Sequence, residues 1–136
     1  MGTRKKNEKI VTKFFKTLSS GDLEKLRKMW HPRAVWEVMV TGIPGAGTHK
    51  GRDYIIDKFI APIRGMFKPG DPKVKVTHIV SRGNLVACET VGTCKFADGR
   101  DYNNKYAWFV ELRDGKVYRL REYMDSYYIS TLALKP

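Results

Sequence analysis

The sequence predicts an α+β fold in which three helices precede a mostly antiparallel, strongly curved sheet. Apolar residues recur at helical spacing in the first half of the chain. Four runs rich in β-branched and aromatic residues follow after residue 72, with short glycine-containing turns between them. Helices grouped ahead of consecutive strands are typical of the α+β class, and a curved sheet wrapped on helices leaves a conical hollow between the layers.

The first two helices are predicted at the start of the chain. The first is expected over residues 4–19, where the apolar residues form one buried stripe. Gly21 suits the left-handed conformation that ends a helix, and Asp22 is a good N-cap for a second helix over residues 23–30.

A short strand and a third helix come next. The strand is expected over residues 34–40, and the glycine-rich segment Thr41–Lys50 is interpreted as a flexible lid or rim, with a phosphate cradle as an alternative. The third helix begins near Arg52. Pro62 falls inside its apolar pattern and is expected to kink or end it.

The rest of the chain is predicted to form an antiparallel meander of four strands. Their expected ranges are residues 73–81, 84–97, 101–112 and 116–125. The last two are joined by Arg113-Asp114-Gly115, and an Asp-Gly between two alternating runs is the strongest short-range hairpin signal. No linker or repeat interrupts residues 1–136, so a single domain is expected.

The last strand carries the most informative residue, Glu122. Side chains of a strand alternate between its two faces, and one row of this strand is expected to face the apolar interior: Tyr118, Leu120, Glu122 and Met124. Arg119 and Arg121 point the other way. Desolvation of a carboxyl group raises its pKa toward neutrality, as a general acid or base requires. The alternative is a structural carboxylate, paired with an arginine or bonded to a tyrosine.

Composition limits the classes of partner. The net charge is +12, from 26 Lys and Arg against 14 Asp and Glu, but the basic residues are scattered and no RNA-binding motif of basic and aromatic residues is present. A solvated surface is expected, without a nucleic-acid partner. No signal peptide and no apolar run of about 20 residues is found, so a cytoplasmic protein that does not enter membranes is expected.

The cysteines and histidines give no sign of a disulfide or a metal. Cys88 and Cys94 are placed far apart along one predicted strand, beyond the reach of a disulfide. Buried thiols of this kind suit a reducing compartment. His31, His49 and His78 have no metal-ligand spacing, and no metal site is expected.

Six short motifs carry a resemblance to a known superfamily. In order, they are Leu18-Ser-Ser-Gly-Asp22, Trp36-Glu37, Gly51-Arg52, Asp98-Gly-Arg-Asp-Tyr102, Asp114-Gly-Lys-Val117 and Arg121-Glu-Tyr-Met-Asp125. Over nearly its whole length the chain resembles the nuclear transport factor 2-like superfamily, in its SnoaL-like and ketosteroid isomerase-like branch. The resemblance implies a cone-shaped fold with a pocket closed by the helices, often in a homodimer. It also implies enzymes that use pocket carboxylates and tyrosines for isomerisation, cyclisation, dehydration or epoxide opening, usually without a cofactor.

The catalytic groups of the two best-known enzymes of this kind carry over poorly. The general base and the oxyanion-hole tyrosine and acid of ketosteroid isomerase fall on Val38, Phe14 and about Ala107. In the limonene epoxide hydrolase pattern, the water-positioning residues fall on Trp36 and Val38, the Arg and Asp on about Glu89 and Val91, and the last Asp on Glu122. The resemblance therefore implies neither of these two mechanisms.

The predicted site combines two carboxylates with an apolar pocket. Glu122 and Glu89 are the catalytic candidates, and Glu89 shares a proton with Glu122 if it points inward or is surface charge if it points outward. The predicted pocket residues are Phe14, Trp30, Trp36, Val38, Tyr54, Phe59, Phe109, Tyr118, Leu120 and Met124. Tyr102 and Tyr106 can donate to a ligand carbonyl or pack in the core. Asn104 is either a pocket amide or a sheet-edge hydrogen bond.

These residues predict a cofactor-independent enzyme that acts by acid–base chemistry on a small apolar or aromatic molecule. A non-catalytic ligand-binding or dimeric association domain is the alternative. A homodimer is expected through the outer face of the sheet, because interfaces are enriched in aromatic residues and arginine. The residues expected on that face are Arg119, Arg121, Tyr123 and Asp125, beside Tyr106, Trp108 and Val110 or their neighbours.

Overall fold

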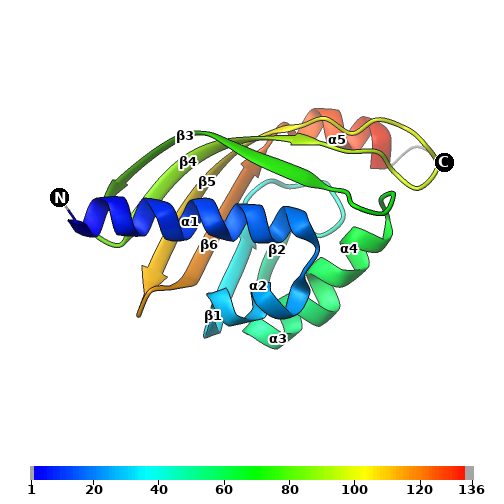
Figure 1. The fold of residues 1–136 in the computed structure, drawn as a ribbon. Helices are drawn as coiled ribbons and strands as arrows, with labels where there is room; N and C mark the ends of the chain where they lie inside the picture. The colour runs from blue at the N-terminus through cyan, green and yellow to red at the C-terminus, as the bar shows by residue number, and fades with distance from the viewer. Residues whose placement is uncertain (1, 134–136) are drawn as a thin grey trace.

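Six strands form one curved mixed sheet in the order β2-β1-β6-β5-β4-β3 in the computed structural model, which describes residues 2–133 (Figure 1). The strands are β1 (Trp30–Val38), β2 (Gly47–Lys50), β3 (Lys73–Arg82), β4 (Leu85–Thr93), β5 (Lys105–Arg113) and β6 (Lys116–Met124). Only the pair β1 and β6 is parallel; the other neighbours are antiparallel. The predicted α+β class is confirmed, and the sheet is not closed into a barrel.

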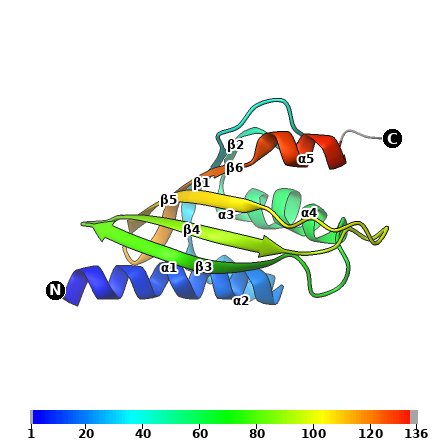
Figure 2. The same cartoon turned by 90° about the horizontal axis from the view of Figure 1, so that it is seen from above.

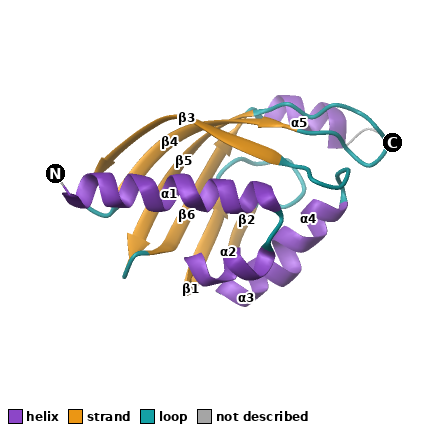
Figure 3. Cartoon of the chain, viewed as in Figure 1, coloured by secondary structure: helices purple, strands orange, loops and turns teal. Residues whose placement is uncertain are grey.

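Apart from α5, the helices gather on the inner side of this sheet. The helices are α1 (Gly2–Ser20), α2 (Leu23–Met29), α3 (Arg52–Tyr54), the π-helix η1 (Ile55–Ile60), α4 (Ala61–Gly65) and α5 (Ser126–Ala133). Helix α1 crosses the sheet (Figure 3), and a view from above shows it running beside β3, while α5 lies on the opposite side of the molecule (Figure 2).

The first two helices form as predicted. The inward stripe of α1 includes Phe14 and Leu18, and the chain reverses at Gly21, whose φ of 79° is the left-handed conformation that glycine adopts without strain. The Asp22 side chain accepts a hydrogen bond from the Lys25 backbone N–H at 3.0 Å, which caps α2. Trp30 is not the last helical residue; it begins β1.

The segment predicted as a lid is partly a strand. Gly47–Lys50 forms β2, which pairs with β1 from Val35 to Val38. Only the preceding turn remains a loop, and Gly45 lies against the ring of Phe59 there. The prediction of a flexible loop over the whole of residues 41–50 is therefore wrong, because backbone pairing with β1 holds its second half.

Pro62 does not end the third helix. The helix continues to Gly65, but its middle turn widens into η1, where the Ala61 N–H bonds to the Ile56 carbonyl five residues earlier. Pro62 then stands in the first turn of α4, where a missing backbone N–H is tolerated. The π-helical turn before Pro62 thus lets the helix continue past the proline.

The meander is confirmed, and β4, β5 and β6 are shorter than predicted, whereas β3 is one residue longer. Asp114 and Gly115 have φ values of 54° and 71°, so the β5–β6 hairpin turns through two left-handed residues, as its Asp-Gly pair predicts. Residues 94–104 leave the sheet and form a loop, pinned by the bridge between Phe67 and Phe96.

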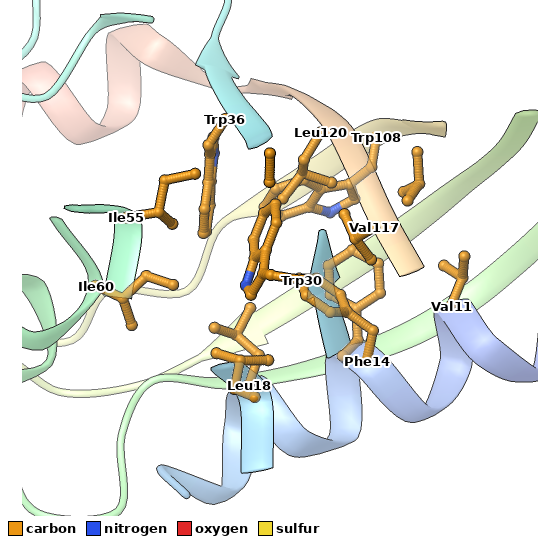
Figure 4. Close-up of a cluster of buried hydrophobic side chains, with 14 of the residues drawn as sticks. Val11, Phe14, Leu18, Trp30, Trp36, Ile55, Ile60, Trp108, Val117 and Leu120 are labelled. Atoms are coloured by element: carbon orange, nitrogen blue, oxygen red, sulfur yellow. The ribbon is translucent and has the colours of Figure 1, made fainter. Parts of the chain in front are cut away.

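Two apolar clusters hold the molecule together. The main one lies between the sheet and the helices and contains Phe14, Trp30, Trp36 and Trp108 (Figure 4). The second joins Phe67, Phe96 and Tyr102, and Tyr128 of α5 packs against it. The sequence pattern does not predict helix α5, which covers this second cluster.

Candidate functional site

Glu122 lies inside the molecule, as its place in the β6 row predicts. Solvent exposure along that row increases toward the end of the strand: Leu120 is 0% exposed, Glu122 is 8% exposed and Met124 is half-buried. The carboxyl group therefore lies between the fully buried Leu120 and the half-buried Met124, and it is itself almost completely shielded from bulk water.

Among the described residues, a single side chain donates a hydrogen bond to this carboxyl group. Trp36 donates its indole Nε1–H to Glu122 Oε1 at 2.9 Å. Within residues 2–133, no lysine, arginine or histidine forms an ion pair with Glu122. Burial raises the pKa of Glu122 to about 7, and the Trp36 bond opposes that shift only in part. The carboxyl group can therefore both give and take a proton near neutral pH.

Aromatic rings line the inner side of this group. Trp36 stacks on Trp30 with ring centroids 5.8 Å apart and meets the edge of Phe59 at 5.1 Å, and Phe14 meets Trp30 at 5.2 Å. Figure 4 shows Trp30, Trp36 and Trp108 turned toward one another beneath β6. The predicted wall residues Phe14, Trp30, Trp36 and Phe59 are thus brought together.

Val38 is also buried, and it lies beside Glu122 in the sheet. Val38 pairs with Glu122 across the parallel β1–β6 ladder, and Trp36 is on the same strand as Val38. The side chains that pack over this part of the sheet come from the helices, Phe59 of η1 among them.

Three of the predicted site residues point away from the inner face. Glu89 is exposed on the outer face, with its carboxylate 3.3 Å from His78 Nδ1, so it cannot share a proton with Glu122. Phe109 is 38% exposed on that same face and Tyr54 is 51% exposed. Glu89 therefore takes the outward alternative and is not a catalytic candidate, and the predictions of Phe109 and Tyr54 as pocket residues are wrong, because the alternation of β5 and the start of the third helix turn them outward.

Tyr118 leaves the predicted row because of a β-bulge. The β5–β6 register shifts after Glu111, so Leu112 pairs with Val117 and Val117 takes the buried position. The Tyr118 ring lies instead under the Arg113 guanidinium, 3.8 Å from its carbon. Leu120, Glu122 and Met124 follow the bulge and keep their inward direction.

Half-buried Val74, Tyr106 and Met124 lie at the Met124 end of the inner face of the sheet. Val74 pairs with Gly92 across β3 and β4, and Tyr106 pairs with Met124 across β5 and β6. Gly92 allows Tyr106 to lie close, since a Cβ there would stand 3.1 Å from the tyrosine ring. Further partly buried apolar residues packed against the main cluster are Val40, Ile43 and Ile63.

Two shallow recesses lie on the solvent side of α1, away from Glu122. Their volumes are about 510 and 390 Å³, and both are lined mainly by Lys5, Lys9 and Lys13; no predicted pocket residue lines either one. The aromatic side chains described above occupy the space beside Glu122. The predicted pocket stays a prediction.

The other chemical groups of the described residues offer no second site. Cys88 and Cys94 are free and buried, and burial raises the pKa of each thiol to about 12, so neither is a ready nucleophile. Across residues 2–133 no group of three His, Cys, Asp or Glu side chains is placed to hold a metal ion. None of the helices described is long and apolar enough to cross a membrane.

Comparison of the sequence with models of known protein families gives one match. A family model described as the SnoaL-like domain matches residues 11–120. The chain belongs to the SnoaL-like family. No curated protein matches the chain.

Solved structures place this SnoaL-like chain within a broad fold group. It is similar to TerC co-crystallised with polyporic acid (18% identity, TM-score 0.82, covering 96% of this chain and 99% of the other). It is also similar to an LEH-like epoxide hydrolase from M. tuberculosis (18% identity, TM-score 0.78, covering 96% of this chain and 91% of the other). A third similar structure is assigned as a SnoaL-like polyketide cyclase from Jannaschia sp. CCS1 (16% identity, TM-score 0.81, covering 100% of this chain and 96% of the other). Identities this low show a common nuclear transport factor 2-like fold alone.

Proposed function

We propose that this SnoaL-like protein is a cofactor-independent enzyme in which Glu122 transfers protons within a small apolar molecule. The observation that carries the proposal is the buried Glu122 carboxyl group, held by one bond from Trp36 and without a cationic partner among the described residues. With its pKa raised to about 7, both protonation states are populated at neutral pH. Isomerisation, cyclisation, dehydration and hydrolysis all need such a group.

The surroundings restrict the ligand to an apolar or aromatic molecule. Trp30, Trp36 and Phe59 present ring faces and edges on the inner side of Glu122. Such a ligand displaces or parts these side chains from the Met124 end, where the row is half-buried. Two of the similar structures are an LEH-like epoxide hydrolase and a SnoaL-like polyketide cyclase, which supports an enzyme of this general kind. The homodimer and the cytoplasmic location remain part of the proposal.

Proton transfer can be tested without knowing the natural substrate. Exchange of the α-protons of 2-tetralone in D₂O and hydration of styrene oxide, both followed by NMR, report on acid–base catalysis of two reaction classes. We expect the wild-type protein to accelerate at least one of them and Glu122→Gln to lower that rate by about 100-fold or more, the usual contribution of a general acid or base. Glu89→Gln, a carboxylate on the outer face, is the matched control and should leave the rate unchanged.

A non-catalytic ligand-binding or association domain is the second candidate. It is favoured by the close packing of aromatic side chains beside Glu122. If neither reaction is accelerated, or if the Glu122→Gln and Glu89→Gln proteins behave alike, the enzyme proposal fails and this second function replaces it.

A further inference from the structure

The solvent side of α1 carries a row of positive charges. Its lysines recur at the three- and four-residue spacing that brings side chains to one side of a helix, and all of them are exposed. The members of this lysine stripe are Lys5, Lys6, Lys9, Lys13 and Lys16. The opposite side of the helix, with Phe14 and Leu18, faces the core. Figure 2 shows α1 along one side of the molecule, and no other described element covers its outer side.

The charges of the lysine stripe have no carboxylate partner within residues 2–133. The only acidic residue of α1, Glu8, accepts a hydrogen bond from the Ser81 hydroxyl of β3 at 2.6 Å. In contrast, Arg27 of the next helix is paired with carboxylates of α2, α3 and η1. The basic side of α1 is therefore left uncompensated, while the neighbouring helix is neutralised.

This arrangement of charge works against the helix that carries it. Like charges three or four residues apart destabilise a helix. The first turn of α1 contains no acidic residue, so Lys5 and Lys6 also oppose the positive end of the helix dipole. A partner that brings a row of negative charges relieves both repulsions, and this points to a polyanion.

The stripe matches the charge spacing of a nucleic-acid strand. From Lys5 to Lys16 the helix rises about 16 Å, so the stripe carries a positive charge about every 3–4 Å along its axis. One strand of duplex DNA carries a negative charge about every 3.4 Å of its axis. The two shallow recesses on this side of α1 lie between the same lysines, so one phosphate group can contact more than one ammonium group.

Other polyanions fit this surface less well. A helix that lies on an anionic membrane inserts apolar side chains into the lipid, but every exposed residue of α1 except Gly2 is polar or charged. Proteins that bind single strands stack the bases on aromatic side chains, and the aromatic residues of α1, Phe14 and Phe15, are 0% exposed. Ammonium groups contact phosphates as point charges, which gives binding without sequence recognition.

We propose that the lysine stripe of α1 binds the phosphate backbone of double-stranded nucleic acid, independently of base sequence. This revises the expectation that no nucleic acid is bound, which rests on basic residues that are scattered along the sequence. Folding of α1 gathers five of them on one side. The surface is separate from Glu122, which lies inside the molecule.

Binding to a fluorescein-labelled DNA duplex of about 20 base pairs, followed by fluorescence anisotropy at several NaCl concentrations, tests the proposal. Neutralising one phosphate with each of the five lysines gives a slope of log K against log salt concentration of about −4.5. We therefore expect the affinity to fall about twentyfold between 50 and 100 mM NaCl. A second duplex of unrelated sequence should bind equally well.

Charge reversal at the centre of the stripe provides the variant. Lys9→Glu combined with Lys13→Glu should lower the affinity at 50 mM NaCl at least tenfold and reduce the slope to about −3, because two phosphate contacts are lost. The new glutamates lie three or four residues from the remaining lysines of the stripe, which favours the helix, and circular dichroism checks the fold.

The matched control reverses two lysines elsewhere and lowers the net charge by the same amount. Lys58 of η1 and Lys105 of β5 are exposed and form no ion pair in the described part of the chain. Lys58→Glu combined with Lys105→Glu should keep the affinity within about threefold of wild type and leave the slope unchanged, because no phosphate contact is lost.

Several outcomes would overturn the nucleic-acid surface. They are no binding of either duplex at 50 mM NaCl, a clear preference between the two duplexes, and an equal loss of affinity in the two double variants. Vesicles of phosphatidylcholine and phosphatidylserine that bind as tightly as the duplex, and lose the protein on charge reversal of α1, would assign the stripe to a membrane surface instead. Poly-glutamate that displaces the duplex at equal charge concentration would assign it to an acidic polypeptide.

Discussion

At the scale of single residues, Glu122 links stability to pH. Its pKa is about 7 in the folded protein and near its ordinary 4.5 in the unfolded chain. Between these pH values the folded protein holds a proton that the unfolded chain has released. The free energy of unfolding therefore falls as pH rises from about 4.5 to about 7, by about 3 kcal/mol in total from this group. Above pH 7 the contribution of Glu122 stays constant.

Glu122→Gln should remove that dependence. The amide oxygen can still accept the Trp36 bond, but it does not ionise. We expect the free energy of unfolding of the variant, relative to wild type, to rise by about 2 kcal/mol between pH 5 and pH 7.5. Urea unfolding of both proteins across this range measures the difference and cancels the contributions of other groups. Parallel stability curves would mean that Glu122 is ionised when buried and acts as a structural partner.

The site residues that the sequence predicts correctly owe their positions to local periodicity. Strand alternation depends only on the backbone of the strand, so the pattern of β6 alone assigns Leu120, Glu122 and Met124 to the inner face. It assigns Tyr118 wrongly, because the bulge depends on pairing with β5. Neither row of β4 is clearly apolar, so the face of Glu89 could not be decided from its own strand.

At the scale of elements, strong capping and turn signals are reliable, and short elements are hard to predict. The Asp22 cap and the Asp114-Gly115 turn have a direct local cause, and both are confirmed. Strand β2 has four residues and begins with a glycine, so only its pairing with β1 identifies it. Helix α5 has eight residues and depends on contacts with the loop of residues 94–104, which are distant in the sequence.

The docking of α5 provides a prediction at this scale. Tyr128 stacks on Tyr102 at 5.7 Å, and its hydroxyl oxygen accepts the Asn103 backbone N–H at 3.2 Å. Tyr128→Ala should weaken this docking by about 1–2 kcal/mol, through lost packing and a lost hydrogen bond. Hydrogen exchange should become faster at the Asn103 amide and stay unchanged in the middle of β5. Tyr127→Ala removes an exposed ring of the same helix and should have no effect; equal acceleration in both variants would show that α5 is not held by Tyr128.

At the scale of the whole molecule, charge and apolar surface are separated. Part of the net charge of +12 lies on the solvent side of α1, where Lys5, Lys9 and Lys13 follow one another at helical spacing. The outer face of the sheet instead exposes large apolar residues; they are Val80 (68%), Leu85 (40%), Phe109 (38%) and Tyr123 (37%). Two copies of the chain repel each other through α1, whereas the sheet face offers surface that association would bury.

A homodimer through this outer face is the last prediction. Tyr106, Trp108 and Val110 point inward, so the residues that flank them, with Phe109 at the centre, form the surface. The Arg121 guanidinium lies 5.5 Å from the Phe109 ring, an arrangement of aromatic and arginine side chains that interfaces favour.

Light scattering at micromolar concentration should give twice the chain mass of 15.7 kDa. Phe109→Glu should place a charge at the centre of the interface and restore the single-chain mass, whereas Lys16→Glu on the exposed face of α1 should leave the dimer intact. A wild-type protein of 15.7 kDa would rule out the dimer, and a dimer that persists in Phe109→Glu would assign it to another surface.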